Sequence, residues 1–164
     1  MAARKGYRLT MTQGRALRIA LNANGILVRY PPDTWSAPGA KDPQGMTNEW
    51  VRTATIERLF TLGLLEVIKE RKVGRRRVPT ACQLTEQGWR IAKGDDRYCQ
   101  FCERYRSVTT QPTGRVVLNA HTLADGTWCK GGLTPAPVPD SHPLGGTVID
   151  DEDRGGGGKG GTFR

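Results

Sequence analysis

The first 95 residues alternate between apolar positions at helical spacing and apolar positions at strand spacing. Leu17, Ala20 and Leu21 recur at i, i+3 and i+4, the period of a helix that buries one face, and Thr12 is its expected N-cap. In residues 65–70 the side chains alternate between two faces at the two-residue period of a strand. The predicted elements in chain order are helix 12–23, strand 25–30, helix 53–62, hairpin strands 65–70 and 78–84, and helix 85–92. The expected fold class is therefore α+β.

Two segments lack such a period. Residues 31–47 are polar and rich in turn-forming residues, with Trp35 as their one large apolar anchor. Residues 134–164 are proline-rich, then acidic, then glycine-rich, and this composition predicts a disordered tail because it buries too little apolar surface. A linker-like segment after the last predicted helix divides the rest into two units, residues 9–93 and residues 97–133.

Three of the chain's four cysteines fall in the second unit, at the spacing of metal ligands. Cys99 and Cys102 are separated by two residues, and His121 and Cys129 follow after gaps of eighteen and seven residues. Two thiolates in a tight turn, completed by a later His and Cys, supply the tetrahedral ligand set that Zn²⁺ prefers, so we expect a structural zinc site. Four protein ligands leave no open position for water, and we therefore expect no metal-based catalysis.

The sequence leaves alternatives to this ligand set open. His142 competes with His121 for the fourth position, and the cysteines could instead be free thiols or a C-x2-C redox pair. The remaining cysteine, Cys82, lies in a strand-like run and is expected to be a small core residue. The N-terminus has no apolar segment of a secretion signal, and unpaired thiols favour a reducing location, so we expect a cytoplasmic protein. No apolar run is long enough to span a membrane.

The net charge of +9 is concentrated in the first part of the chain. Residues 1–95 contain 17 Lys and Arg against 8 Asp and Glu, whereas residues 96–164 contain eight of each. Five cations lie within the seven residues of the predicted hairpin turn, 71–77. A concentration of positive charge of this kind is typical of modules that bind a polyanion, most often nucleic acid.

The order of helix, strand, helix and charged hairpin in residues 9–93 resembles the winged-helix variant of the helix-turn-helix fold. The stretch from Thr53 to Glu66 resembles its recognition helix and first wing strand, and Leu84 to Gly88 resembles the segment that closes the wing. This resemblance implies a helix in the DNA major groove and a wing on the DNA backbone. The residues that it implies for DNA contact are Arg52, Thr55, Arg58 and Thr61 on the helix, and Arg71, Lys72, Arg75, Arg76 and Arg77 on the wing.

Residues 31–47 depart from the winged-helix pattern. A helix-turn-helix carries another helix just before its recognition helix, whereas this segment contains two adjacent prolines and several more turn-formers. Either that helix is very short or a loop replaces it. Winged helices also serve as protein-interaction modules and as structural cores, and both alternatives stay open.

The second unit resembles a zinc ribbon of the type found in small proteins of actinobacteria and their phages. Tyr98-Cys-Gln-Phe-Cys-Glu-Arg104 resembles its first half, and Trp128-Cys-Lys-Gly-Gly132 resembles its second half. The resemblance implies a fold and an origin rather than an activity.

Taken together, the motifs favour a DNA-binding protein over an enzyme. The sequence lacks a P-loop, a dinucleotide-binding fingerprint, a nucleophile elbow and a zinc-protease motif. A nuclease of the His-Asn-His class would need His121 to activate water, but the zinc site uses this residue. We expect a small transcriptional regulator, from a phage or an actinobacterium, that binds duplex DNA and carries a structural zinc. The alternative is an adaptor that docks on a host protein without binding nucleic acid. The sequence does not indicate an oligomeric state.

Overall fold

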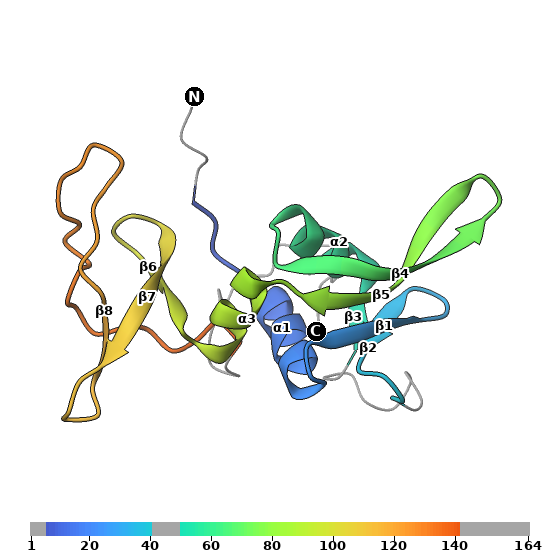
Figure 1. Ribbon diagram of the computed structural model, residues 1–164, viewed down its shortest axis with the longest axis horizontal. Coiled ribbons are helices and arrows are strands. Elements are labelled where there is room, and N and C mark those ends of the chain that lie inside the picture. The colour runs from blue at the N-terminus through green and yellow to red at the C-terminus, as the bar shows by residue number, and fades with distance from the viewer. Residues whose placement is uncertain (1–5, 41–49, 142–164) are drawn as a thin grey trace, which may run out of the picture.

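The computed structural model describes residues 6–40 and 50–141, and this part of the chain contains three helices and two antiparallel sheets (Figure 1). The helices are α1 (Met11–Asn22), α2 (Thr53–Thr61) and α3 (Glu86–Lys93). The strands are β1 (Ile26–Tyr30), β2 (Thr34–Ser36), β3 (Val51–Arg52), β4 (Leu65–Val73), β5 (Arg76–Leu84), β6 (Asp96–Cys99), β7 (Arg104–Thr110) and β8 (Val116–Leu118). The predicted α+β class is confirmed.

The N-cap of helix α1 lies two residues before the predicted one. The N-cap is Thr10, whose hydroxyl accepts the Gln13 N–H at 3.2 Å, while the Gln13 amide accepts the Thr10 N–H at 3.1 Å. This reciprocal pair needs a polar side chain three residues after the cap, which Thr10 has in Gln13. The prediction of Thr12 as N-cap is therefore wrong. The helix stops where predicted, because Asn24 and Gly25 adopt positive φ angles of 55° and 84°.

The first sheet has the strand order β3-β2-β1-β5-β4, and the short strand β2 lies where the sequence predicts turns. Trp35 on β2 is buried, and its indole N–H donates to the Thr53 hydroxyl at 3.1 Å. The anchoring role of Trp35 is confirmed, whereas the expectation of turns throughout 31–47 is wrong for residues 34–36, which pair with β1. The described residues between β1 and α2 contain strands β2 and β3 and no helix.

Strands β4 and β5 form a long hairpin that projects from the sheet (Figure 1). Only the inner part of β5, residues 81–83, pairs with β1 on its other side. The outer part is therefore a two-stranded arm, with Gly74 at φ 61° in its turn. Both strands run further toward the turn than predicted. The charged residues that were expected to form the turn continue the strand pairing, from the pair of Glu70 with Pro79 to the pair of Val73 with Arg76.

The main core lies between the helices and the first sheet. Its fully buried side chains include Leu17 from α1, Ile56 and Leu59 from α2, and Ile91 from α3. Cys82 is buried in the same cluster, as predicted.

The second sheet, β6-β7-β8, belongs to the cysteine-containing unit at the other end of the molecule from the hairpin (Figure 1). A return segment, residues 134–141, runs back from this unit to the helices. In it, the Ser141 hydroxyl donates to the Ala92 carbonyl at 2.6 Å, and the Pro137 carbonyl accepts from Arg97 at 3.0 Å.

The prediction of a disordered tail from residue 134 is therefore wrong for residues 134–141. A proline-rich segment cannot build its own core, but it can pack on one that already exists. The backbone carbonyl of Asp140 lies against Gly14, where a Cβ atom would overlap with it. His142 and the other residues of the predicted tail lie outside the described residues.

Candidate metal centre

The structure brings together four side chains that could hold a metal ion. The three cysteine Sγ atoms and a ring nitrogen of His121 all lie within 4.8 Å of one another. The cluster consists of Cys99, Cys102, His121 and Cys129. All four cysteines of the chain are free thiols, so no disulfide competes with this arrangement. The predicted grouping is confirmed for His121, while His142 lies outside the described residues.

The first two ligands come from the turn between β6 and β7. Cys99 ends β6, and its carbonyl accepts the Glu103 N–H at 2.8 Å, which closes the turn around Cys102. Glu103 has a φ of 55°, a left-handed conformation that reverses the chain immediately before β7. Cys99 and Arg104 are then paired across the two strands. This tight turn directs both thiols to one side.

The other two ligands come from a small hairpin between residues 121 and 129. The Cys129 N–H donates to the His121 carbonyl at 2.9 Å, and Thr122 pairs with Trp128. The Asp125 carboxylate accepts the Thr127 N–H at 2.9 Å and so stabilises the turn at the tip. Because His121 and Cys129 are neighbours across this hairpin, they reach the cluster from adjacent positions.

Two of the distances between donor atoms match the edges of a tetrahedral site. The Sγ atoms of Cys99 and Cys129 are 3.8 Å apart, and the Sγ of Cys102 lies 3.4 Å from Nε2 of His121. Metal–sulfur bonds of about 2.3 Å and metal–nitrogen bonds of about 2.0 Å give tetrahedral edges of about 3.8 and 3.5 Å. Three sulfurs and one imidazole are also a soft donor set, which suits thiophilic metals and not Mg²⁺ or Ca²⁺.

Backbone groups support this cluster at two points. The Gly131 N–H donates to the Cys129 sulfur at 3.4 Å, and a Cβ atom at Gly131 would overlap with the sulfur of Cys99. The Nδ1 of His121 lies 2.8 Å from the Asn119 carbonyl, which can only accept. Nδ1 therefore carries the proton, and the lone pair of Nε2 faces the cysteines. The sequence analysis missed the Asn119 carbonyl, because a backbone acceptor leaves no signal in residue type.

The thiols have different acidities. Burial raises the pKa of Cys99. Burial also acts to raise the pKa of Cys102, but hydrogen bonds from Arg106, Cys99 and His121 outweigh it and lower the pKa to about 7. The Cys102 thiol is therefore readily ionised at neutral pH, and the thiolate is the form that binds metals.

The residues predicted to contact DNA fall into two groups. The five hairpin cations, Arg71, Lys72, Arg75, Arg76 and Arg77, are all exposed. Among the described residues, only Arg77 of these five forms an ion pair, with Glu70 at 3.8 Å. On α2 and at its N-cap, Arg52, Arg58 and Thr61 are exposed.

Thr55 does not belong to the exposed face of α2. Only 4% of its surface is exposed, because it lies beside Ile56 and Leu59 on the side of α2 that packs into the core. Helical spacing identifies the centre of a buried stripe, but the width of the stripe depends on what covers it. The prediction of Thr55 as a DNA-contacting residue is therefore wrong.

Comparison of the chain with protein-family models, with curated proteins and with solved structures finds no match. None of the described helices combines the length and the apolar character needed to cross a membrane. The chemistry of the Cys/His cluster and of the exposed cations is therefore the basis for a functional proposal.

Proposed function

We propose that this chain binds duplex DNA through its β4–β5 hairpin and that a structural zinc ion stabilises its second unit. The observation that carries the DNA proposal is the group of five exposed cations on an arm that projects from the sheet. A projecting arm can follow the surface of a duplex, and each Lys or Arg that neutralises a phosphate releases a bound counterion. The winged-helix resemblance adds support, since α2 leads directly into this arm.

Helix α2 contributes a second contact surface in this proposal. Arg52 and Arg58 are exposed and are suited to phosphates or to the acceptor edge of guanine. The hydroxyl of Thr61 donates to the Glu57 carbonyl at 3.1 Å, so this residue is a weaker candidate for reading a base. Buried Thr55 takes no part.

Zinc is the proposed metal because of the donor set. Three thiolates and one imidazole at tetrahedral spacing match the structural sites in which zinc is most common. The same four ligands would fill the coordination sphere, so the proposed role is to hold the β6–β7 turn against the 121–129 hairpin. The small core around Cys99, Leu118 and Cys129 supports this proposal, since a unit of this size gains much of its folding free energy from the metal.

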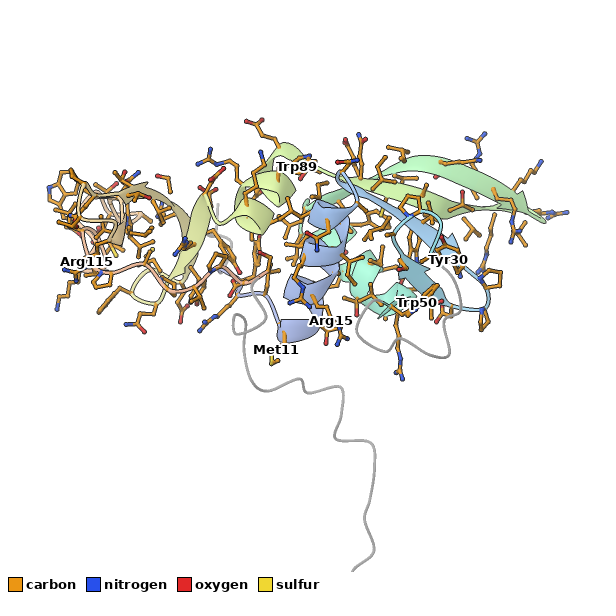
Figure 2. All side chains as sticks on the ribbon, turned by 90° about the horizontal axis from the view of Figure 1, so that it is seen from below. Met11, Arg15, Tyr30, Trp50, Trp89 and Arg115 are labelled. Carbon is orange, nitrogen blue, oxygen red and sulfur yellow. The ribbon has the colours of Figure 1, made fainter. Side chains whose placement is uncertain are left out.

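Fluorescence anisotropy on a random duplex over a salt series tests the DNA proposal. Changing Arg75, Arg76 and Arg77 to Ala should weaken binding and reduce the slope of log K against log salt by about 2 to 3, which is the loss of about three phosphate contacts. The matched control changes three exposed cations of the second unit, Arg104, Arg115 and Lys130, to Ala. Arg115 lies at the end of the molecule far from the hairpin (Figure 2). An equal loss in both variants would show that only net charge matters.

A second pair of variants tests the surface of α2. Arg58→Ala should weaken duplex binding and reduce the salt slope by about 0.9. Thr55→Val should leave both unchanged, because the side chain is buried.

A protein-interaction adaptor is the second candidate, and a specific observation favours it. Trp128 and Leu133 are 73% and 71% exposed, an unusual position for large apolar side chains. Absence of duplex binding by the parent chain at low salt would reject the DNA proposal and leave the adaptor as the better explanation.

A further inference from the structure

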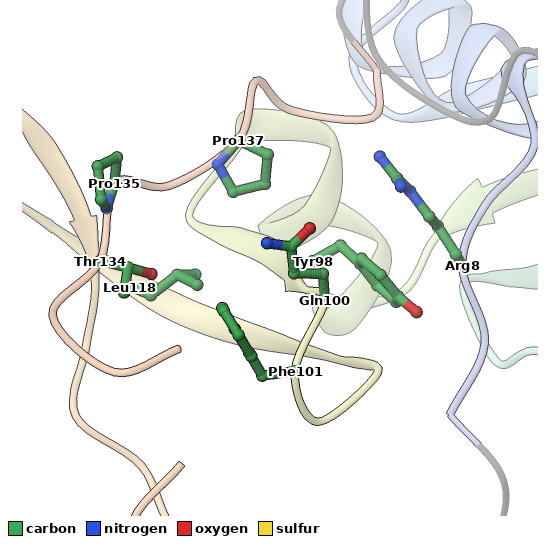
Figure 3. Close-up of a pocket in the computed structure, with 8 residues that line it drawn as sticks. All are labelled: Arg8, Tyr98, Gln100, Phe101, Leu118, Thr134, Pro135 and Pro137. Carbon is green, nitrogen blue, oxygen red and sulfur yellow. The ribbon is translucent and has the colours of Figure 1, made fainter. Parts of the chain in front are cut away.

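A cavity of about 150 Å³ lies where three segments meet. They are the residues just before α1, the turn between β6 and β7 that carries Cys99 and Cys102, and the return segment. Figure 3 shows the residues that line it, with Arg8 at the end near Tyr98. Its lining consists of Arg8, Tyr98, Gln100, Phe101, Leu118, Thr134, Pro135 and Pro137. None of these residues is a metal ligand or belongs to the hairpin.

The most unusual member of this lining is Phe101. It lies between the ligands Cys99 and Cys102, and 52% of its surface is exposed. One edge of its ring approaches Gly131, where a Cβ atom would come within 3.0 Å of it. One edge of the ring therefore faces Gly131, while about half of the side chain stays open to solvent. An open aromatic ring can serve as a stacking platform for a flat ligand.

The polar groups of the cavity point to a ligand that also carries an anion. The Arg8 guanidinium lies 4.9 Å from the centroid of the Tyr98 ring, and no described carboxylate forms an ion pair with it. Gln100 is exposed, and its side-chain amide offers both a donor and an acceptor. An aromatic platform, an amide and a guanidinium that has no ion pair among the described residues together match the ring, the edge and the phosphate of a nucleotide.

We propose that this cavity binds one unpaired nucleobase of a single-stranded nucleic acid. The base stacks on Phe101, the Gln100 amide bonds the base edge, and Arg8 binds the adjacent phosphate. The volume suits one planar ring system and is smaller than the roughly 300 Å³ of a typical small-molecule pocket. A paired base hides its faces in the stack, so a duplex cannot supply this ligand. The site is therefore distinct from the proposed duplex contact of the hairpin.

The test uses the full chain loaded with zinc and fluorescent eight-nucleotide probes of thymidine (DNA) and uridine (RNA). Phe101→Leu keeps an apolar side chain against Gly131 but removes the aromatic face. It should weaken binding of the better probe by about 10-fold, the effect of losing one base–aromatic stack. Trp128→Leu is the matched control, because it removes an exposed aromatic ring of the same unit outside this cavity, and it should change binding less than 2-fold. The ratio of the two probes then assigns DNA or RNA.

Two further measurements keep the outcomes distinct. Duplex binding should be unchanged in Phe101→Leu and weakened in the hairpin variant, so failure of one proposal does not imply failure of the other. Ultraviolet cross-linking of the thymidine probe to the parent chain should label the tryptic peptide of residues 98–104, a result that does not depend on any variant folding. Equal binding by Phe101→Leu and the parent, or cross-links only outside residues 98–104, would overturn the proposal.

Discussion

The Tyr105 hydroxyl donates a hydrogen bond to the carboxylate of Asp140, and the same oxygen accepts the Leu9 N–H at 3.0 Å. Tyr105 is on β7 of the cysteine-containing unit, whereas Leu9 is a buried residue of the main core. Burial, and then the neighbouring Asp140 charge, raise the pKa of Tyr105 well above its usual range. A neutral tyrosine therefore joins the residues just before α1 and the return segment to the second sheet.

Tyr105→Phe should destabilise the folded chain by about 1 to 3 kcal/mol, since it removes the hydrogen bond to the buried Asp140 carboxylate and the one from the Leu9 N–H. Urea unfolding of the zinc-loaded chain measures the free energy. Tyr98→Phe is the matched control, because no hydrogen bond of the Tyr98 hydroxyl is present among the described residues, and it should change stability by less than about 0.5 kcal/mol. Equal effects of the two variants would contradict the role assigned to Tyr105.

The identity of the fourth ligand can be tested with the chain's two histidines. His121→Ala should lower zinc affinity by more than about 100-fold, which exceeds the usual effect of losing an outer-shell partner. His142→Ala should leave the affinity unchanged. A competition titration with a chromogenic chelator measures both, and a loss in His142→Ala alone would reassign the ligand.

Gly131 should be required for metal binding. In Gly131→Ala the new methyl group meets the Cys99 sulfur, so either the sulfur or the following hairpin must move. We expect weaker zinc binding and a lower melting temperature of the second unit. Gly132→Ala is a graded comparison, because the nearest atom to its Cβ is the Ala120 Cα at 3.2 Å, and its effect should be smaller. The reverse order would show that the turn accommodates a side chain at Gly131.

The four thiols should react in two distinct groups. Burial raises the pKa of Cys82 from 9.0 to about 12, so at pH 8 a disulfide reagent should not modify it in the folded chain. We expect three reactive thiols after zinc removal by a chelator, and the fourth only after addition of denaturant. Fast modification of all four in the native, chelated chain would show that the main core opens when the metal leaves.

The same shift has a consequence for stability at high pH. The pKa of Cys82 is higher in the folded chain than in the unfolded chain. The protonated thiol therefore contributes to the free energy of unfolding fully below about pH 9, and this contribution is lost as the pH rises toward about 12. Cys82→Ala should remove this component of the alkaline loss of stability.

The sequence predicted the long elements and the Cys99–Cys102 turn because these depend on local chemistry. Helical spacing of apolar residues located α1 and α2, and the interval of two residues between Cys99 and Cys102 brought both thiols into one turn. Such signals are contained in a few neighbouring side chains.

Apart from the N-cap of α1 and the length of the β4–β5 hairpin, the errors concern features that depend on distant partners. Thr55 is buried because the core extends beyond the strictly apolar stripe of α2. Residues 34–36 form a strand because β1 offers them an edge. The return segment is ordered because α1 and α3 provide a surface for it, and Gly14 leaves the space. None of these partners can be read from the composition of the segment itself.

The return segment also affects how this chain can be divided or recombined. The backbone passes from the helices to the second sheet after Gly94, and it comes back through residues 134–141 to Ala92 and Gly14. A single protease cut near Gly94 would therefore leave two fragments that still hold each other, as the halves of a split protein do. Transplanting the helices without this last segment would expose the surface of α1 that residues 134–141 cover. An exchange of modules, in evolution or in the laboratory, therefore has to include both the connection after Gly94 and the return segment.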